Sequence, residues 1–229
     1  MASEFIFTNK EIRRFSNLSK RKWMKEKWRV VKEHPPYNMN NREKALREAY
    51  AILSSMNIKF WLSGGCLLGA VRDNDFIPWD DDVDMVMFEE EFIPIKHQLK
   101  EKLLNSGFIV RMIDSAFFPK ITYFKYGQKL ALSPLYLDGH LRRRPYKKYL
   151  AKYFNGQETT VFKGMKFLKP SPVEEFLTHV YGDWKTPQKK KEENHEEIYE
   201  PEFFSNRIIL RKIQYRIKLL ERLFSQIFH

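Results

Sequence analysis

The chain has 229 residues, of which 43% are hydrophobic and 15% aromatic, and it carries a formal net charge of +12 at pH 7. This apolar content suffices for a folded core, which excludes a wholly disordered chain, while the single cysteine, Cys66, excludes an intramolecular disulfide framework and a multi-cysteine zinc site. No apolar run reaches the roughly 18 residues of a membrane-spanning helix, and the N-terminus lacks the apolar stretch of a signal peptide, so we expect a cytoplasmic protein.

The first part of the chain is basic and has the pattern of helices. Thr8 and Glu11 have the spacing of a capping box, and the apolar positions that follow predict one helix over residues 8–33, which two prolines end. A second helix is predicted over residues 41–56, because apolar residues recur there at helical spacing.

Strands and helices alternate in the middle of the chain. The predicted elements are a strand at 59–62, the turn Ser63-Gly64-Gly65, a helix at 66–71, a strand at 82–88 and a helix at 89–105. Strand-like stretches dominate the part that follows. Its predicted elements are strands at 108–113, 120–126 and 131–137, a helix at 145–154, a hairpin at 159–167 and a helix that starts at Pro172. Residues 205–228 predict a final basic amphipathic helix.

Acidic residues are concentrated in one short part of this basic chain. Residues 73–91 contain nine acidic residues and no basic one. In a strand alternate side chains share a face, so Asp80, Asp82 and Asp84 are expected to point the same way, with Asp81 pointing elsewhere. Carboxylates at this spacing suit Mg²⁺ or Mn²⁺, and the calcium-loop pattern fails because it needs glycine at its sixth position, where Met85 stands. A solvated acidic loop is the competing interpretation.

The glycine turn before this block predicts a phosphate contact. A strand that ends in Ser63, Gly64 and Gly65 and leads into a helix exposes backbone N–H groups at the helix start, where an anion is favoured. Arg72 is expected either to bind a phosphate or to form an ion pair with a nearby aspartate. Lys120 is either a further phosphate contact or an ordinary surface lysine.

The run LSGGCLLGAVRDNDFIPWDDDVDM, residues 62–85, resembles the hallmark of the LicD/fukutin family, and PVEEFLTHVYGDW, residues 172–184, resembles that family's closing segment. The resemblance implies an α+β fold of the nucleotidyltransferase type, with a small mixed sheet flanked by helices. It divides the chain into a basic helical extension (1–40), a LicD-like catalytic domain (41–187) and a charged linker with the amphipathic helix (188–229).

The resemblance also implies an activity. Members of the family transfer a phosphorylated alcohol, such as phosphocholine, ribitol phosphate or glycerol phosphate, from a CDP-linked donor to a sugar hydroxyl, as in lipopolysaccharide or capsule biosynthesis. A divalent metal, Mg²⁺ or Mn²⁺, is implied as cofactor. The implied metal ligands are Asp82 and Asp84 on one strand, Asp80 as an added ligand, and a third carboxylate from a neighbouring strand. Asp138 is the favoured third carboxylate and Asp114 its competitor.

The same resemblance assigns roles and partners. Asp82, Asp84 and Asp138 are the implied catalytic residues, and Asp138 or Asp84 would accept the proton of the attacking hydroxyl. The implied partners are the CDP-linked donor and a glycan acceptor, whether lipid-linked or soluble. The amphipathic helix at 205–228 has two interpretations, namely packing against the protein and peripheral contact with an anionic membrane.

Two other functional classes remain open at this point. The first keeps the fold and adds nucleotides to a nucleic acid or a small molecule. The second is a basic nucleic-acid-binding module without catalysis, to which the interleaved Tyr146 and Tyr149 would contribute. The second class leaves the aspartates unexplained, so nucleic acid is not the expected partner.

Overall fold

The computed structural model consists of a mixed β-sheet and the helices that cover it, and the acidic segment leads into one strand of this sheet. It describes residues 7–30, 38–113, 119–144 and 147–188. The strands are β1 (Trp61–Leu62), β2 (Asp82–Phe88), β3 (Ile109–Ile113), β4 (Lys120–Lys125), β5 (Gln128–Asp138), β6 (Leu141–Arg144), β7 (Lys147–Leu150), β8 (Thr159–Phe162) and β9 (Met165–Leu168). The helices are α1 (Asn9–Ser16), α2 (Lys20–Val30), α3 (Met39–Ser55), α4 (Gly64–Arg72), α5 (Glu89–Asn105) and α6 (Val173–Tyr181).

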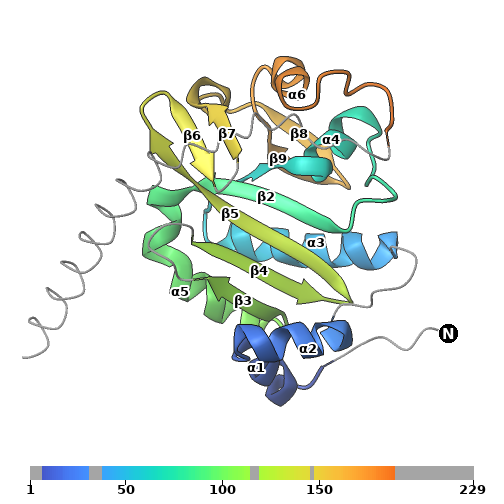
Figure 1. Cartoon of the computed structure of the whole chain (residues 1–229), viewed down its shortest axis with the longest axis vertical. Coiled ribbons are helices and arrows are strands. Elements are labelled where there is room, and N and C mark those ends of the chain that lie inside the picture. Colours follow the sequence, from blue (N-terminus) through green and yellow to red (C-terminus); the bar gives the residue numbers. More distant parts are fainter. Residues whose placement is uncertain (1–6, 31–37, 114–118, 145–146, 189–229) are drawn as a thin grey trace, which may run out of the picture.

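The main sheet has the strand order β3-β4-β5-β2-β1-β9-β8, with β6 and β7 attached as a hairpin to β5. The central strand β2 runs parallel to β5 and antiparallel to β1. Helices α3 and α5 lie behind the sheet, and α4 and α6 lie at the end that also carries the β6–β7 hairpin (Figure 1). This confirms the predicted α+β class with a mixed sheet flanked by helices.

The alternation of side chains along β2 explains how one strand serves both the core and the site. Val83, Met85 and Met87 are fully buried on one face of the strand. Asp82 and Asp84 occupy the intervening positions and therefore point to the other face. The apolar positions thus hold the strand in the core, so the aspartates are presented on a rigid element.

The basic N-terminal segment forms two helices rather than the single helix predicted over residues 8–33. The predicted capping box is present, since the Thr8 side chain accepts a hydrogen bond from the Glu11 N–H and the Glu11 carboxylate accepts one from Thr8. Helix α1 ends at Asn17, and the Ser19 hydroxyl accepts a hydrogen bond from the Lys22 N–H at the start of α2. A local cap at serine therefore outweighs the continuous helical pattern.

The helix predicted at residues 145–154 is wrong for half of its eight described residues. Residues 147–150 form β7, which pairs antiparallel with β6, and only Ala151–Phe154 turn into a short 3₁₀ helix. Strand pairing buries Tyr149 and brings the hairpin onto β5, which outweighs the local helix preference of the lysines. Asp114, Tyr146 and the helix predicted at 205–228 lie outside the described residues.

Within the described residues, each helix is too short or too polar to cross a lipid bilayer.

Candidate active site

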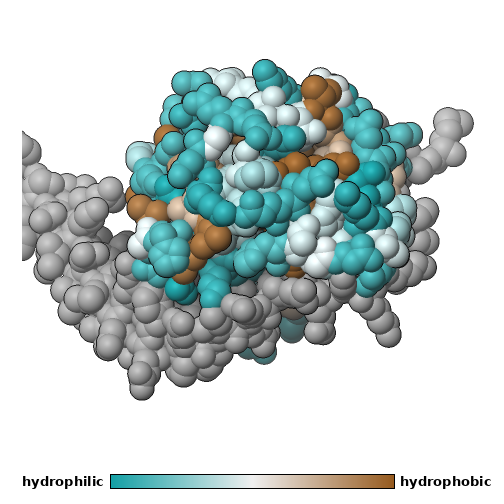
Figure 2. Space-filling view, turned by 90° about the horizontal axis from the view of Figure 1, so that it is seen from above, coloured by the Kyte–Doolittle hydropathy of each residue, from teal (hydrophilic) through white to brown (hydrophobic). Residues whose placement is uncertain are grey.

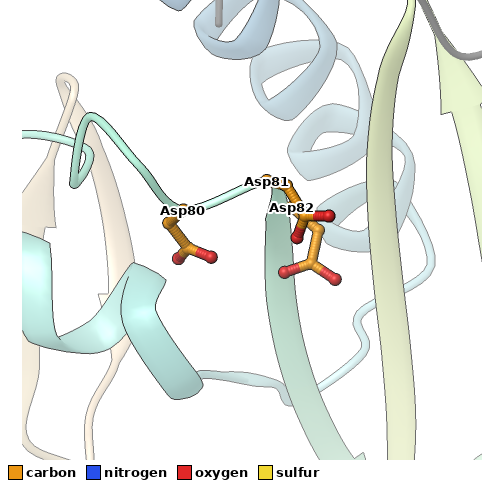
Figure 3. A group of neighbouring side chains, drawn as sticks. All are labelled: Asp80, Asp81 and Asp82. Atoms are coloured by element: carbon orange, nitrogen blue, oxygen red, sulfur yellow. The ribbon is translucent and has the colours of Figure 1, made fainter. Parts of the chain in front are cut away.

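Three consecutive aspartates form an acidic cluster where the chain enters β2. Asp80 belongs to the loop before the strand, whereas β2 begins at Asp82 (Figure 3). One carboxylate oxygen from each of Asp80, Asp81 and Asp82 lies within 4.8 Å of the others. Asp81 was expected to point away, but strand alternation does not extend to residues that precede the strand. The cluster therefore includes Asp81, which is exposed to solvent.

The glycine turn makes room for two of the carboxylates. A Cβ atom at Gly64 would lie 3.3 Å from Oδ2 of Asp84, and one at Gly65 would lie 2.1 Å from Oδ2 of Asp80. Gly64 also has a positive φ of 59°, a conformation that favours glycine. Ser63 is buried, and its N–H donates to the Asp84 carbonyl at 3.0 Å. Asp80 and Asp84 thus approach the N-terminal end of α4, whose dipole favours negative charge.

Burial and mutual repulsion raise the proton affinity of these carboxylates. Burial, followed by the negative charge of Asp82, raises the pKa of Asp80 from its ordinary 3.8 to about 7. The same two causes raise the pKa of Asp84. The positive charge of Arg42, a residue of α3 that is only 1% exposed, opposes the shift at Asp80. A site that holds like charges together at this cost is typical of a functional centre rather than a solvated loop.

Cationic side chains from other strands surround the acidic cluster. Nζ of Lys129, on β5, lies 2.5 Å from Oδ2 of Asp82. The positive charges of Arg144, Lys120 and Lys147 act on Asp84 and oppose the rise of its pKa. Burial lowers the pKa of Lys120, with Asp84 opposing that shift. These four residues, hereafter the cationic set, come from four different strands, β4, β5, β6 and β7.

The strand that neighbours β2 supplies no carboxylate beside the acidic cluster. In the parallel pairing of β2 with β5, Asp82 lies opposite Lys129 and Asp84 lies opposite Ala131. Asp138 stands seven residues beyond Ala131, roughly 20 Å further along the strand at about 3.3 Å per residue. It forms an ion pair with Arg143, 2.8 Å away. The structure therefore does not bring Asp138 together with Asp82 and Asp84; the carboxylates that it places beside Asp82 are Asp80 and Asp81, from the loop before β2.

Arg72 adopts the second of its two expected roles. Its guanidinium donates to both carboxylate oxygens of Asp73, at 2.9 and 2.7 Å, and to the carbonyl of Trp184 at 3.4 Å. The hydrogen bond to the Trp184 carbonyl connects the end of α4 to the segment after α6. Lys120, in contrast, lies near Asp84 and is not an ordinary surface lysine.

Sequence reasoning missed four charged residues of the site: Arg42, Lys129, Arg144 and Lys147. Lys129 could have been identified only weakly, from its position two residues before Ala131 on the same face of the strand. Arg144 ends β6 and Lys147 begins β7, a strand that was predicted as part of a helix, so their approach to Asp84 depended on the pairing of these two strands. Arg42 reaches the cluster from a helix far away in the sequence, and no spacing rule predicts such a contact.

Comparison with known proteins shows similarity to one protein family and to several of its members. Residues 57–170 match a family model described as LicD/FKTN/FKRP, nucleotidyltransferase domain. The chain is 39% identical over 57 residues to "Ribitol 5-phosphate transferase FKRP" of Mus musculus and of Homo sapiens, which is 25% of this chain and 12% of those proteins. It is 44% identical over 43 residues to "Lipopolysaccharide cholinephosphotransferase LicD" of Haemophilus influenzae, which is 19% of this chain and 16% of that protein.

The matched segments thus span less than a fifth of the length of these relatives. Among solved structures, the chain is similar to the antibiotic-resistance factor ANT(2'')-Ia, with a TM-score of 0.44 and 14% identity over 83% of this chain and 100% of that one.

Proposed function

The chain belongs to the LicD/FKTN/FKRP family, and from this premise we propose that it transfers a phosphorylated alcohol from a CDP-linked donor to a sugar hydroxyl. The observation that carries the proposal is the juxtaposition of the acidic cluster with the cationic set. A donor diphosphate carries a high negative charge, so a site that contains several carboxylates can bind it only if positive charge is also present. The cationic set supplies part of this charge, and a metal ion at the acidic cluster would supply the rest. The named relatives, a ribitol 5-phosphate transferase and a cholinephosphotransferase, support the class of transferred group.

The acidic cluster fits a divalent metal. Its donors are hard carboxylate oxygens within 4.8 Å of one another, which suits Mg²⁺ or Mn²⁺. The raised pKa values of Asp80 and Asp84 support the same conclusion, because burial and the charge of Asp82 outweigh the nearby cations and leave negative charge that a bound metal ion would compensate. Asp80, Asp81, Asp82 and Asp84 would hold the ion. When bound, it would neutralise the donor diphosphate and stabilise the departing CMP.

The remaining steps belong to the protein's own residues. Lys120, Arg144 and Lys147 bind the phosphate oxygens of the donor from the side opposite the acidic cluster, and Gly64 and Gly65 contribute backbone N–H groups at the start of α4. The N–H of the adjacent Ser63 is already bonded to the Asp84 carbonyl, so Ser63 borders the site without donating to the phosphate. The oxygen of the sugar hydroxyl attacks the phosphorus that carries the alcohol, and the bond from that phosphorus to CMP breaks. Asp84 accepts the hydroxyl proton, because burial and the charge of Asp82 raise its pKa and so increase its affinity for a proton.

We further propose that the protein acts in the cytoplasm, at the membrane surface where glycans are assembled, and that its acceptor is either soluble or lipid-linked. The basic surface of α2 is compatible with an anionic lipid nearby, since Lys20, Arg21, Lys22 and Lys25 are all exposed.

A thermal-shift screen tests the donor class. The melting temperature is measured with CDP-ribitol, CDP-choline and CDP-glycerol, each with Mg²⁺ and with EDTA, because a ligand that binds the folded state raises it by mass action. One donor is expected to raise the melting temperature only when Mg²⁺ is present, and more than CDP does. If UTP or ATP stabilised the protein while all CDP-linked donors failed, the transfer would be of a nucleotidyl group instead.

A further inference from the structure

A pocket lies beside the acidic cluster, on the side away from the cationic set. Its volume is about 210 Å³, and its walls come from α4, from the loop before β2 and from the chain around and after the end of α6. We call it the α4–α6 pocket. Its charged and aromatic lining residues are Arg72, Trp79, Asp80, Tyr181, Asp183 and Trp184. Figure 2 views this end of the molecule and shows small hydrophobic patches among mostly hydrophilic residues.

The pocket adjoins the acidic cluster, with which it shares one wall. Asp80 lines the pocket and is also a member of the acidic cluster. Gly65, next to Asp80, lines it as well. A hydroxyl group of a molecule in the pocket therefore lies within reach of a phosphorus atom held at the cluster.

The walls combine flat aromatic rings with fixed hydrogen-bonding groups. The indole N–H of Trp184 donates to the Thr178 hydroxyl at 3.2 Å, which fixes that ring. The Arg72 guanidinium is held by Asp73. Trp79 is 37% exposed and is therefore available for contact. Aromatic faces that pack against C–H groups, with charged groups that bind hydroxyls, suit a sugar ring.

Charge separates this pocket from the rest of the site. Its charged lining residues are one arginine and two aspartates, whereas Lys120, Lys129, Arg144 and Lys147 gather on the other side of the cluster. The donor diphosphate belongs with those cations, which leaves the pocket to a neutral molecule. The volume lies below the roughly 300–1,000 Å³ of sites for drug-sized ligands, so it fits a single ring.

We infer that the α4–α6 pocket binds one pyranose ring of the acceptor, with Trp79 packing against the ring and Asp183 binding its hydroxyls. This inference rests on the proposed function and adds to it the place and the chemistry of acceptor recognition. It also predicts that acceptor binding and donor binding are separable by mutation, since different walls carry them.

Binding of simple glycosides tests the inference on the whole chain. Saturation-transfer difference NMR is recorded with methyl β-D-galactopyranoside and methyl N-acetyl-β-D-glucosaminide, and the affinity for CDP with Mg²⁺ is measured by calorimetry on the same samples. The variants are Trp79→Ala, Trp79→Phe and Asp183→Asn; asparagine can still accept the hydrogen bond that Asp183 receives from the Thr186 N–H. Ile93→Ala and Glu174→Gln, an exposed apolar residue on α5 and an exposed carboxylate on α6, are the matched controls.

The wild type and both controls should bind at least one glycoside through its ring protons. Trp79→Ala and Asp183→Asn should lose at least fivefold in signal, Trp79→Phe should keep most of it, and the affinity for CDP should change less than twofold throughout. Absence of glycoside binding by the wild type, or unchanged binding by Trp79→Ala, would overturn the inference. A fall in CDP affinity in the same variants would make this the nucleotide pocket. Failure of the proposed function differs from all of these, because it would appear as absent binding of CDP with Mg²⁺.

Discussion

Asp82 and Asp84 owe their position to the alternation of β2, whose buried methionines and valine fix the strand. Changing either carboxylate to an amide removes a ligand charge where a diphosphate must be neutralised. We expect Asp82→Asn and Asp84→Asn each to lower turnover by two or more orders of magnitude, measured as CMP release. Asp81→Asn should be milder, since Asp81 is exposed and other carboxylates flank it. Equal losses at all three positions would contradict the distinction between strand and loop residues.

Ala131 marks the place where a third carboxylate from β5 would stand. It is fully buried and lies opposite Asp84 in β2 and Thr122 in β4. Ala131→Asp should therefore lower the melting temperature in EDTA, because it adds a buried charge beside Asp84, and should increase the stabilisation by Mg²⁺ relative to the wild type. Ala131→Asn has the same size without the charge and serves as control. A Mg²⁺ response that is the same in both variants would show that residue 131 does not face the metal site.

Asp80 makes the metal-free protein sensitive to pH. Its folded-state pKa, about 7, lies above its ordinary 3.8, so between these values the folded state binds a proton that the unfolded state lacks. Stability is then greatest at low pH within this range and falls as pH rises toward 7. In EDTA, Asp80→Asn should raise the melting temperature relative to the wild type more at pH 8 than at pH 5. A difference that does not change with pH would contradict the assigned pKa.

At the scale of elements, the N-terminal helices are integrated into the sheet. Ile12 and Phe15 of α1 are buried, and the Ser16 hydroxyl accepts a hydrogen bond from the Val110 N–H of β3 at 2.9 Å. The Trp23 ring of α2 packs on Phe124 of β4, with ring centroids 5.1 Å apart. Helix α1 thus docks on the edge strand β3, which β4 and β5 separate from β2 (Figure 1).

A substitution in α1 should therefore act on stability and not on the site. Phe15→Ala is expected to cost about 3–5 kcal/mol in the free energy of unfolding, as is typical for removing a buried phenyl ring, and to leave the affinity for CDP with Mg²⁺ unchanged. Met24→Ala, at a residue 57% exposed on α2, should cost less than about 0.5 kcal/mol. Denaturant unfolding measures both. A Phe15→Ala protein as stable as the wild type would show that α1 does not dock on β3.

Sequence patterns predicted correctly those strands and helices that are determined by their own residues. Strand β2 and helix α5 begin and end at the predicted residues, because alternation and helical spacing are strong there. The β6–β7 hairpin was not predictable, since it forms through pairing with β5. The prediction that Asp138 lies beside Asp84 was wrong for a related reason. Its position at the end of a strand was predicted, but the parallel register, which puts it at the far end from Asp84, was not. Register between distant strands is a property of the folded sheet rather than of either segment.

At the scale of the whole molecule, acidic residues are concentrated in one segment of an otherwise basic chain. The acidic residues 73–91 stand against a net charge of +12, and folding brings basic residues from four strands around them. On the other side of the cluster, the α4–α6 pocket carries aromatic rings and a mixed set of charges. Under the proposed function, this arrangement would give an anionic donor and a neutral acceptor separate approaches to one group of carboxylates.

The central claim is a metal-dependent transfer at the acidic cluster, and release of CMP from a CDP-linked donor tests it most directly. CMP is measured with the donor that the thermal-shift screen selects, in Mg²⁺, in excess EDTA, and after Mg²⁺ is restored. We predict that EDTA abolishes CMP release, that added Mg²⁺ or Mn²⁺ recovers it, and that Asp84→Asn is inactive in all three conditions. Full CMP release in EDTA, or full activity of Asp84→Asn in Mg²⁺, would contradict the account.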